Sequence, residues 1–142
     1  MPSINFFEED ISFKLKNKTR VKQWIKTSIE AEGYKLKELN YIFCSDKYLL
    51  KINQQYLDHD TYTDIVTFDN SEIDGVIEGD IFISIDRIRE NAVKFNSGEI
   101  NELHRVIIHG ALHLFGYQDK TAEKKKIMTG KEDHYLSIRN FT

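Results

Sequence analysis

The segment HGALHLFGYQD, residues 109–119, contains two histidines four positions apart, followed by a glycine and then an aspartate at intervals of three. Its first seven residues are the end of a longer apolar segment, residues 98–115, that has the periodicity of a helix. Side chains four apart on a helix share one face, with Cβ atoms roughly 5–6 Å apart, so both imidazoles can reach one ion. Gly116 can end the helix in a left-handed turn that returns the aspartate to the same point. The spacing therefore predicts a metal site.

The expected ligands are His109, His113 and Asp119, and their spacing matches the metzincin motif H-E-x-x-H-x-x-G-x-x-H in every interval. Gly110 replaces the glutamate that acts as general base in those proteases, which argues against a peptidase. An aspartate oxygen is an ordinary zinc ligand, and three protein ligands leave a position for water, as in catalytic sites. We expect one Zn²⁺ per chain, or another divalent transition metal. The competing interpretation is that both histidines are ordinary surface or core residues, which the added glycine and carboxylate disfavour.

The periodicity along the rest of the chain predicts an α+β fold with mixed α/β layers in a single domain, residues 1–142. We expect a central mixed sheet of about four strands packed by helices, one of which is a zincin-like metal helix at 98–115. The predicted strands are 4–7, 38–46, 63–68 and 75–86, with the last two forming a hairpin or neighbouring pair. Three other helices are predicted at 19–34, 86–96 and 121–140. A further helix is predicted to begin after Asp46, which would be its N-cap.

Apolar side chains at regular spacing predict which faces of these elements are buried. On the helix at 98–115 the apolar stripe is expected to face the core, whereas Arg105 lies on the polar face, one turn before His109. The stripe consists of Leu103, Val106, Ile107 and Leu114. The helix at 19–34 carries Val21, Trp24, Ile25, Ser28 and Ile29 at helical spacing. Arg105 is our preferred contact for a substrate phosphate.

The composition limits the cellular setting and the classes of partner. Twenty basic and 23 acidic residues give a net charge of −3, so any contact with nucleic acid requires a local patch. The single cysteine, Cys44, excludes an internal disulfide framework and suits a reducing compartment. No apolar run approaches the ~18 residues of a membrane span, and the N-terminus has acidic residues where a signal peptide is basic. We expect a cytoplasmic protein that does not bind membranes.

The segment 109–119 also resembles the H-G-x-L-H-L-x-G-Y-D-H signature of the YbeY endoribonucleases. Upstream, INQQYLDHDTYTDIVTF is similar to the family's N-x-x-Y-R…T-D-V-L-S-F segment, GDIFIS resembles its G-D-I-x-I strand, and ELHRVIIHG fits the approach to the metal helix. The resemblance covers approximately residues 38–130. It implies a metal-dependent enzyme that cleaves single-stranded RNA in the maturation of small-subunit ribosomal RNA. The implied partners are ribosomal RNA or the small ribosomal subunit, and not DNA, while the oligomeric state stays open.

The chain departs from the family pattern at two positions. The family's third ligand is usually histidine, where this chain has Asp119; alternatively, Asp119 belongs to the N-cap region of the next helix and only two histidines bind metal. The family's arginine beside the upstream tyrosine is Leu57 here. His59 is a candidate substitute for binding a phosphate, although a solvated loop histidine is the more ordinary interpretation.

The catalytic residues remain unassigned at this stage, because Gly110 offers no side chain to act as general base. Asp64 and Asp80, each near the start of a strand, could support a metal-bound imidazole or merely shape a turn. Two other functions stay open. One is a ribosome-assembly or RNA-binding factor with a structural metal, and the other is a metal-dependent hydrolase of a peptide or small molecule.

Overall fold

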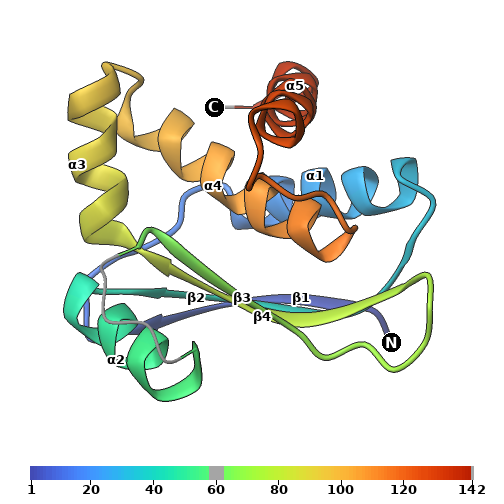
Figure 1. Ribbon diagram of the computed structural model, residues 1–142, viewed down its shortest axis with the longest axis horizontal. Coiled ribbons are helices and arrows are strands. Elements are labelled where there is room, and N and C mark those ends of the chain that lie inside the picture. Colours follow the sequence, from blue (N-terminus) through green and yellow to red (C-terminus); the bar gives the residue numbers. More distant parts are fainter. Residues whose placement is uncertain (58–62, 142) are drawn as a thin grey trace.

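The structure, a computed structural model, describes residues 1–57 and 63–141 and consists of one sheet with helices on both faces (Figure 1). The strands are β1 (Ser3–Glu9), β2 (Lys35–Cys44), β3 (Ile65–Asp69) and β4 (Val76–Ser84). The helices are α1 (Lys18–Ala31), α2 (Asp46–Leu57), α3 (Ile85–Phe95), α4 (Glu99–Leu114) and α5 (Ala122–Ser137). The predicted α+β class with a four-stranded sheet is confirmed.

The four strands form a mixed sheet in the order β1-β2-β4-β3. β2 pairs in parallel with β1 and with β4, and such pairs need long crossover connections, which contain helices here. β3 and β4 are antiparallel neighbours, with Thr67 opposite Ile81, which confirms the predicted strand pair. β3 is therefore an edge strand, and it lies next to α4.

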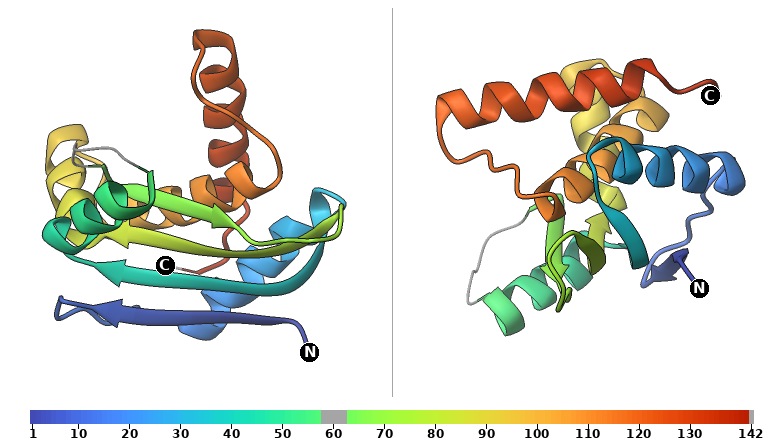
Figure 2. Two further views of the ribbon diagram at one scale, coloured as in Figure 1. Left: turned by 60° about the horizontal axis from the view of Figure 1, so that its bottom comes forward. Right: turned by 90° about the vertical axis from the view of Figure 1, so that its right-hand side faces the viewer.

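Most helices lie on one face of the sheet. α1 and α4 cover that face, α5 packs on α4 farther from the sheet, and α2 lies on the opposite face (Figures 1 and 2). The predicted apolar face of α1 is confirmed, because the same five side chains are buried. On β4, Ile81 and Ile83 face the main core, whereas Phe82 packs with Cys44 and Leu49 on the α2 side. None of the helices in the described part of the chain is long and apolar enough to cross a membrane.

The helix predicted at 98–115 is α4, and it packs closely against the sheet. Leu103, Val106 and Ile107 are buried as predicted, while Leu114 is half-buried and contacts the edge of the core. A Cβ atom at Gly110 would lie 2.9 Å from Ile65 Cδ1 and 3.0 Å from Ile81 Cγ2. At these distances any side chain at position 110 requires the side chains of Ile65 and Ile81 to move from their packed positions. The close packing therefore explains why glycine occupies the position of the metzincin base.

One predicted helix cap is wrong. The Tyr48 N–H donates to Ser45 Oγ at 3.1 Å, so Ser45 and not Asp46 caps α2. Asp46 lies inside the first turn, where its carboxylate accepts hydrogen bonds from Ser84 Oγ at 2.6 Å and from Arg87 Nε at 3.0 Å. The Asp46 side chain therefore connects α2 to the start of α3 instead of ending its own helix.

Candidate metal centre

The structure brings together His109, His113 and Asp119 at the C-terminal end of α4 and in the loop that follows. The two histidine Nε2 atoms are 3.0 Å apart, and Asp119 Oδ2 lies 3.4 Å from the first and 3.6 Å from the second. Ligands ~2.05 Å from a tetrahedral ion lie about 3.3 Å from one another. These donor atoms therefore have the chemistry and the separation to hold one divalent ion.

Hydrogen bonds at Nδ1 fix the orientation of both imidazoles. His109 Nδ1 bonds to Glu132 Oε2 at 2.5 Å, and His113 Nδ1 bonds to the backbone oxygen of Tyr117 at 3.0 Å. With Nδ1 as the donor, each ring presents the lone pair of Nε2, as in carboxylate–histidine–zinc arrangements. Two such lone pairs facing each other at 3.0 Å repel unless a proton or a cation lies between them. The arrangement fits a bound cation.

The loop after α4 places the third donor. Gly116 has φ +100°, the left-handed conformation predicted for it, and lies in the turn that ends α4. Asp119 follows the turn, and its side chain is 38% exposed beside the two imidazoles. Thr121 caps α5 by accepting a hydrogen bond from the Lys124 N–H at 3.1 Å. The capping role considered for Asp119 therefore belongs to Thr121.

The charges around His109 favour a cation. Burial lowers the pKa of His109, but the hydrogen bond that it donates to Glu132 and the charges of Glu132, Asp119 and Asp64 outweigh burial and raise that pKa overall. At His113, burial and the neighbouring His109 lower the pKa. The negative potential of the carboxylates would stabilise a positive ion between the two rings.

A cleft of about 180 Å³ opens beside this group, and three further carboxylates line it, those of Asp64, Glu102 and Glu132. Burial raises the pKa of Asp64 and also that of Glu102, which accepts a hydrogen bond from Ser97 Oγ at 3.4 Å. A raised pKa makes a carboxylate a stronger base towards a proton of water. The cleft therefore offers candidates for the base that the sequence left unassigned.

The other carboxylate considered from the sequence, Asp80, lies elsewhere. Its two oxygens accept hydrogen bonds from the Asn40 and Asn70 side-chain amides, at 3.0 Å and 3.1 Å. These contacts connect strands on the α2 side of the sheet, away from α4. Asp80 therefore has a structural role within the sheet and does not support a metal-bound imidazole.

Of the two predicted phosphate contacts, Arg105 lines the cleft and is already engaged by α5. It donates from Nη1 to Glu132 Oε1 at 2.8 Å and from Nη2 to Asp133 Oδ1 at 2.5 Å. Glu132 thus bridges Arg105 and His109. His59, the other candidate, falls in residues 58–62, outside the described residues.

Sequence reasoning missed two carboxylates that orient the site. Glu132 is buried on α5 and aligns with the buried Met128 and Tyr135 at helical spacing. A charged residue within an apolar stripe was the available signal. The other carboxylate, Glu32, follows α1, and nothing in its local sequence marks it.

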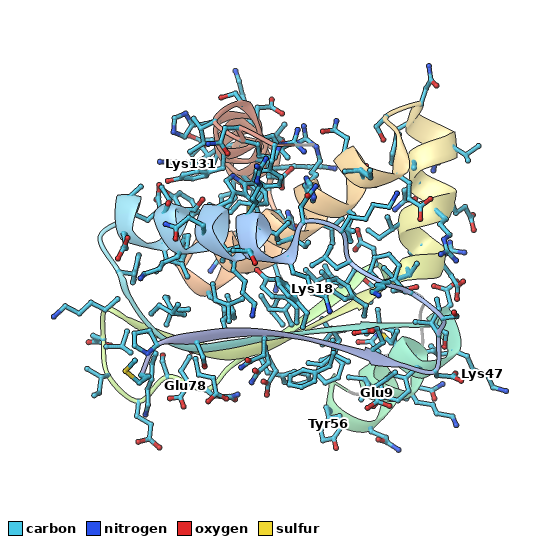
Figure 3. The ribbon with its side chains drawn as sticks, turned by 180° about the vertical axis from the view of Figure 1, so that it is seen from behind. Glu9, Lys18, Lys47, Tyr56, Glu78 and Lys131 are labelled. Carbon is cyan, nitrogen blue, oxygen red and sulfur yellow. The ribbon has the colours of Figure 1, made fainter. Side chains whose placement is uncertain are left out.

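Glu32 connects the end of α1 to the loop after α4 and to α5. Its Oε1 accepts a hydrogen bond from the Tyr117 hydroxyl at 2.6 Å, and its Oε2 accepts one from Lys131 Nζ at 3.1 Å and one from the Tyr135 hydroxyl. Lys131 extends from α5 above the end of α1 (Figure 3). Burial raises the pKa of Glu32, but these hydrogen bonds outweigh it and lower the pKa overall. One carboxylate therefore anchors both the loop that orients His113 and the helix that carries Glu132.

Comparisons with known proteins agree with the sequence motif and the fold. The family model described as Endoribonuclease YbeY matches residues 3–140. The Endoribonuclease YbeY of Cytophaga hutchinsonii is 55% identical over 98% of this chain and 97% of its own length. That of Karelsulcia muelleri is 50% identical over 94% and 93%. The solution structure of a Thermotoga maritima protein has a TM-score of 0.66 and 29% identity, covering 95% of this chain and 87% of that one. The chain therefore belongs to the YbeY endoribonuclease family.

Proposed function

We propose that this protein is a metal-dependent endoribonuclease that hydrolyses single-stranded RNA, with His109, His113 and Asp119 as its metal ligands. The observation that carries the proposal is the triangle of donor atoms in which both Nε2 atoms are oriented by hydrogen bonds at Nδ1. Zn²⁺ suits two nitrogen donors and one carboxylate, and another divalent transition metal is the alternative. When bound, the ion supplies Lewis acidity and lowers the pKa of water.

The protein's own groups would position the RNA and manage protons. Asp64 and Glu102 line the same cleft as the metal-site residues, and each is suited to accept a proton from water. Arg105 and His59 are the proposed contacts for the scissile phosphate. Arg105 can hold a phosphate oxygen while it keeps one of its bonds to α5, because a guanidinium has several donors.

We place this activity in the maturation of small-subunit ribosomal RNA, in the cytoplasm, with residues 1–142 acting as one domain. Membership of the YbeY endoribonuclease family supports an RNA substrate, and the match to residues 3–140 supports a single functional unit. The buried free thiol of Cys44 is compatible with a reducing compartment. Ribosomal RNA or the small subunit is the proposed partner.

The test is cleavage of single-stranded RNA by zinc-reconstituted protein, beside the variants His109→Ala and His113→Ala. Duplex RNA, single-stranded DNA and a peptide serve as control substrates. We expect cleavage of single-stranded RNA that both variants lose, with no cleavage of DNA or peptide. Binding of RNA with equal, negligible cleavage by all three proteins would instead identify an assembly factor with a structural metal. Turnover of the peptide alone would identify a different hydrolase.

A further inference from the structure

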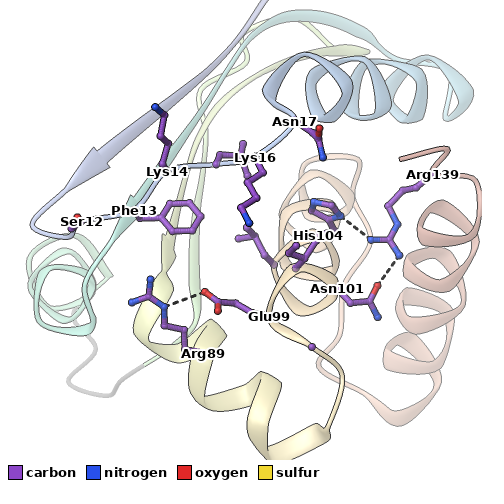
Figure 4. A pocket seen from close by; sticks show the side chains of 14 residues that line it. Ser12, Phe13, Lys14, Lys16, Asn17, Arg89, Glu99, Asn101, His104 and Arg139 are labelled. Carbon is purple, nitrogen blue, oxygen red and sulfur yellow. Dashed lines mark hydrogen bonds and ion pairs between the residues drawn. The ribbon is translucent and has the colours of Figure 1, made fainter. Parts of the chain in front are cut away.

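A second cavity, of about 790 Å³, lies on the other side of α4 from the metal centre. Its walls come from residues 12–17, the first turns of α4 and Arg139 near the end of the chain (Figure 4). Among the described residues, none lines both this cavity and the metal cleft. Its volume falls within the range of roughly 300–1,000 Å³ that is typical of small-molecule sites.

The charged groups around this cavity are mostly positive, although the chain as a whole carries a net charge of −3. Lys14, Lys16, Arg89 and Arg139 line it, and the one carboxylate among the lining residues that the structure describes, Glu99, pairs with Arg89 at 3.1 Å. In Figure 4, Lys16 extends into the space between Phe13 and His104, whereas Lys14 points away. The local potential therefore favours an anion.

Arg139 is held in place by neutral acceptors. It donates to His104 Nδ1 at 2.7 Å, to Asn101 Oδ1 at 2.7 Å and to the Leu136 carbonyl oxygen at 2.9 Å. Within residues 1–57 and 63–141, no carboxylate forms an ion pair with it. Burial and the neighbouring Arg139 lower the pKa of His104 to about 4, so the histidine accepts this bond as a neutral ring. The guanidinium is thus oriented, and its charge is uncompensated.

The cavity also offers groups that recognise a base. Phe13 provides a partly exposed ring on its wall, and Asn17 and Asn101 provide side-chain amides. Bases stack on aromatic rings whatever their sequence, and amides can bond to their polar edges. Two cations, Lys16 and Arg139, together with an aromatic ring and amide groups in one cavity give the composition expected of a nucleotide site.

We propose that this cavity binds a nucleotide, with its phosphate held by Lys16 and Arg139 and its base against Phe13. The nucleotide is either one unit of a single-stranded RNA or a free mononucleotide, because the recognised chemistry is the same. The inference is separate from the metal centre, since it uses no residue of that site.

Amide NMR of the full chain tests the proposal, with adenosine 5′-monophosphate, adenosine, inorganic phosphate and a single-stranded RNA hexamer as probes. We expect the monophosphate or the hexamer to shift the signals of residues 13–17, Asn101 and His104, and adenosine to bind at least about tenfold more weakly than the phosphorylated probe. Shifts with the monophosphate would indicate a free-nucleotide site, and shifts with the hexamer alone would indicate an RNA path. Shifts confined to the metal cleft, or caused equally by inorganic phosphate alone, would overturn the proposal.

Two charge reversals provide the matched comparison. Lys16→Glu should weaken the binding of the phosphorylated probe by at least about tenfold, because it replaces a phosphate contact with a repulsive charge. Lys26→Glu, on the exposed face of α1 and outside the cavity, should leave it unchanged. The proposal fails if both variants bind like the wild type, or if both lose binding equally. Thermal unfolding of both variants checks that neither change acts by unfolding the chain.

Discussion

Two histidines on α4 lie in environments of opposite charge. His109 faces the carboxylates of Glu132, Asp119 and Asp64, which raise its pKa. His104, on the other side of the helix, is buried between Trp24 and Phe141 and beside Arg139, and its pKa falls to about 4. The surroundings of His109 therefore favour a cation beside its ring, whereas those of His104 keep that ring neutral, as a hydrogen-bond acceptor. Neighbours from other elements cause this difference.

The largest effect is expected from His104, which should make the stability of the protein depend on pH. Its pKa is lower in the folded chain than the usual 6.5, so protons bind the unfolded chain first as the pH falls. The free energy of unfolding should therefore decrease from about pH 6.5 to about pH 4, by ~3 kcal/mol from this group.

Urea unfolding of the wild type and of His104→Gln measures this contribution, because glutamine can accept the bond from Arg139 without titrating. The difference in the free energy of unfolding between the two proteins should shrink or change sign as the pH falls through that window. A constant difference from pH 7 to pH 4 would show that His104 does not carry the effect.

A smaller effect is expected from Glu132, whose carboxylate accepts the hydrogen bond from His109 Nδ1. Glu132→Gln keeps the size of the side chain and removes the charge that orients the imidazole. The dissociation constant for zinc should rise about 10–100-fold, the usual result of losing such a partner. Asp133→Asn is the matched control, because Asp133 also pairs with Arg105 but does not contact His109. Equal effects of the two variants would contradict a direct role for Glu132.

The smallest of these effects is expected from Glu32, which acts on the site only through other residues. Glu32→Ala should weaken zinc binding about tenfold, the lower end of the range for indirect support, because it frees both Tyr117 and Lys131. Glu30→Ala, on the exposed side of α1, should have no effect. A purely structural Glu32 would lower the melting temperature of the metal-free protein and leave the zinc affinity unchanged.

The features that could be predicted from the sequence are those set by local spacing along the chain. The spacing of His109, His113 and Gly116 lies within one helix and its turn, and the structure brings Asp119 to the same point as expected. The strand order β1-β2-β4-β3 was not predicted, because long crossovers permit more than one neighbour for β2. The bonds of Glu132 and Glu32 were missed because they form only when α5 packs on α4 and α1.

Zinc titration of the wild type, Asp119→Ala and Asp119→His, in competition with a chelator, tests the central claim most directly. The account predicts one zinc ion per wild-type chain and retained binding in Asp119→His, because an imidazole can bind at about 2.0–2.1 Å from the same position. Asp119→Ala should bind at least about tenfold more weakly. Absence of zinc uptake by the wild type, or equal affinity in Asp119→Ala, would contradict a site with these three ligands.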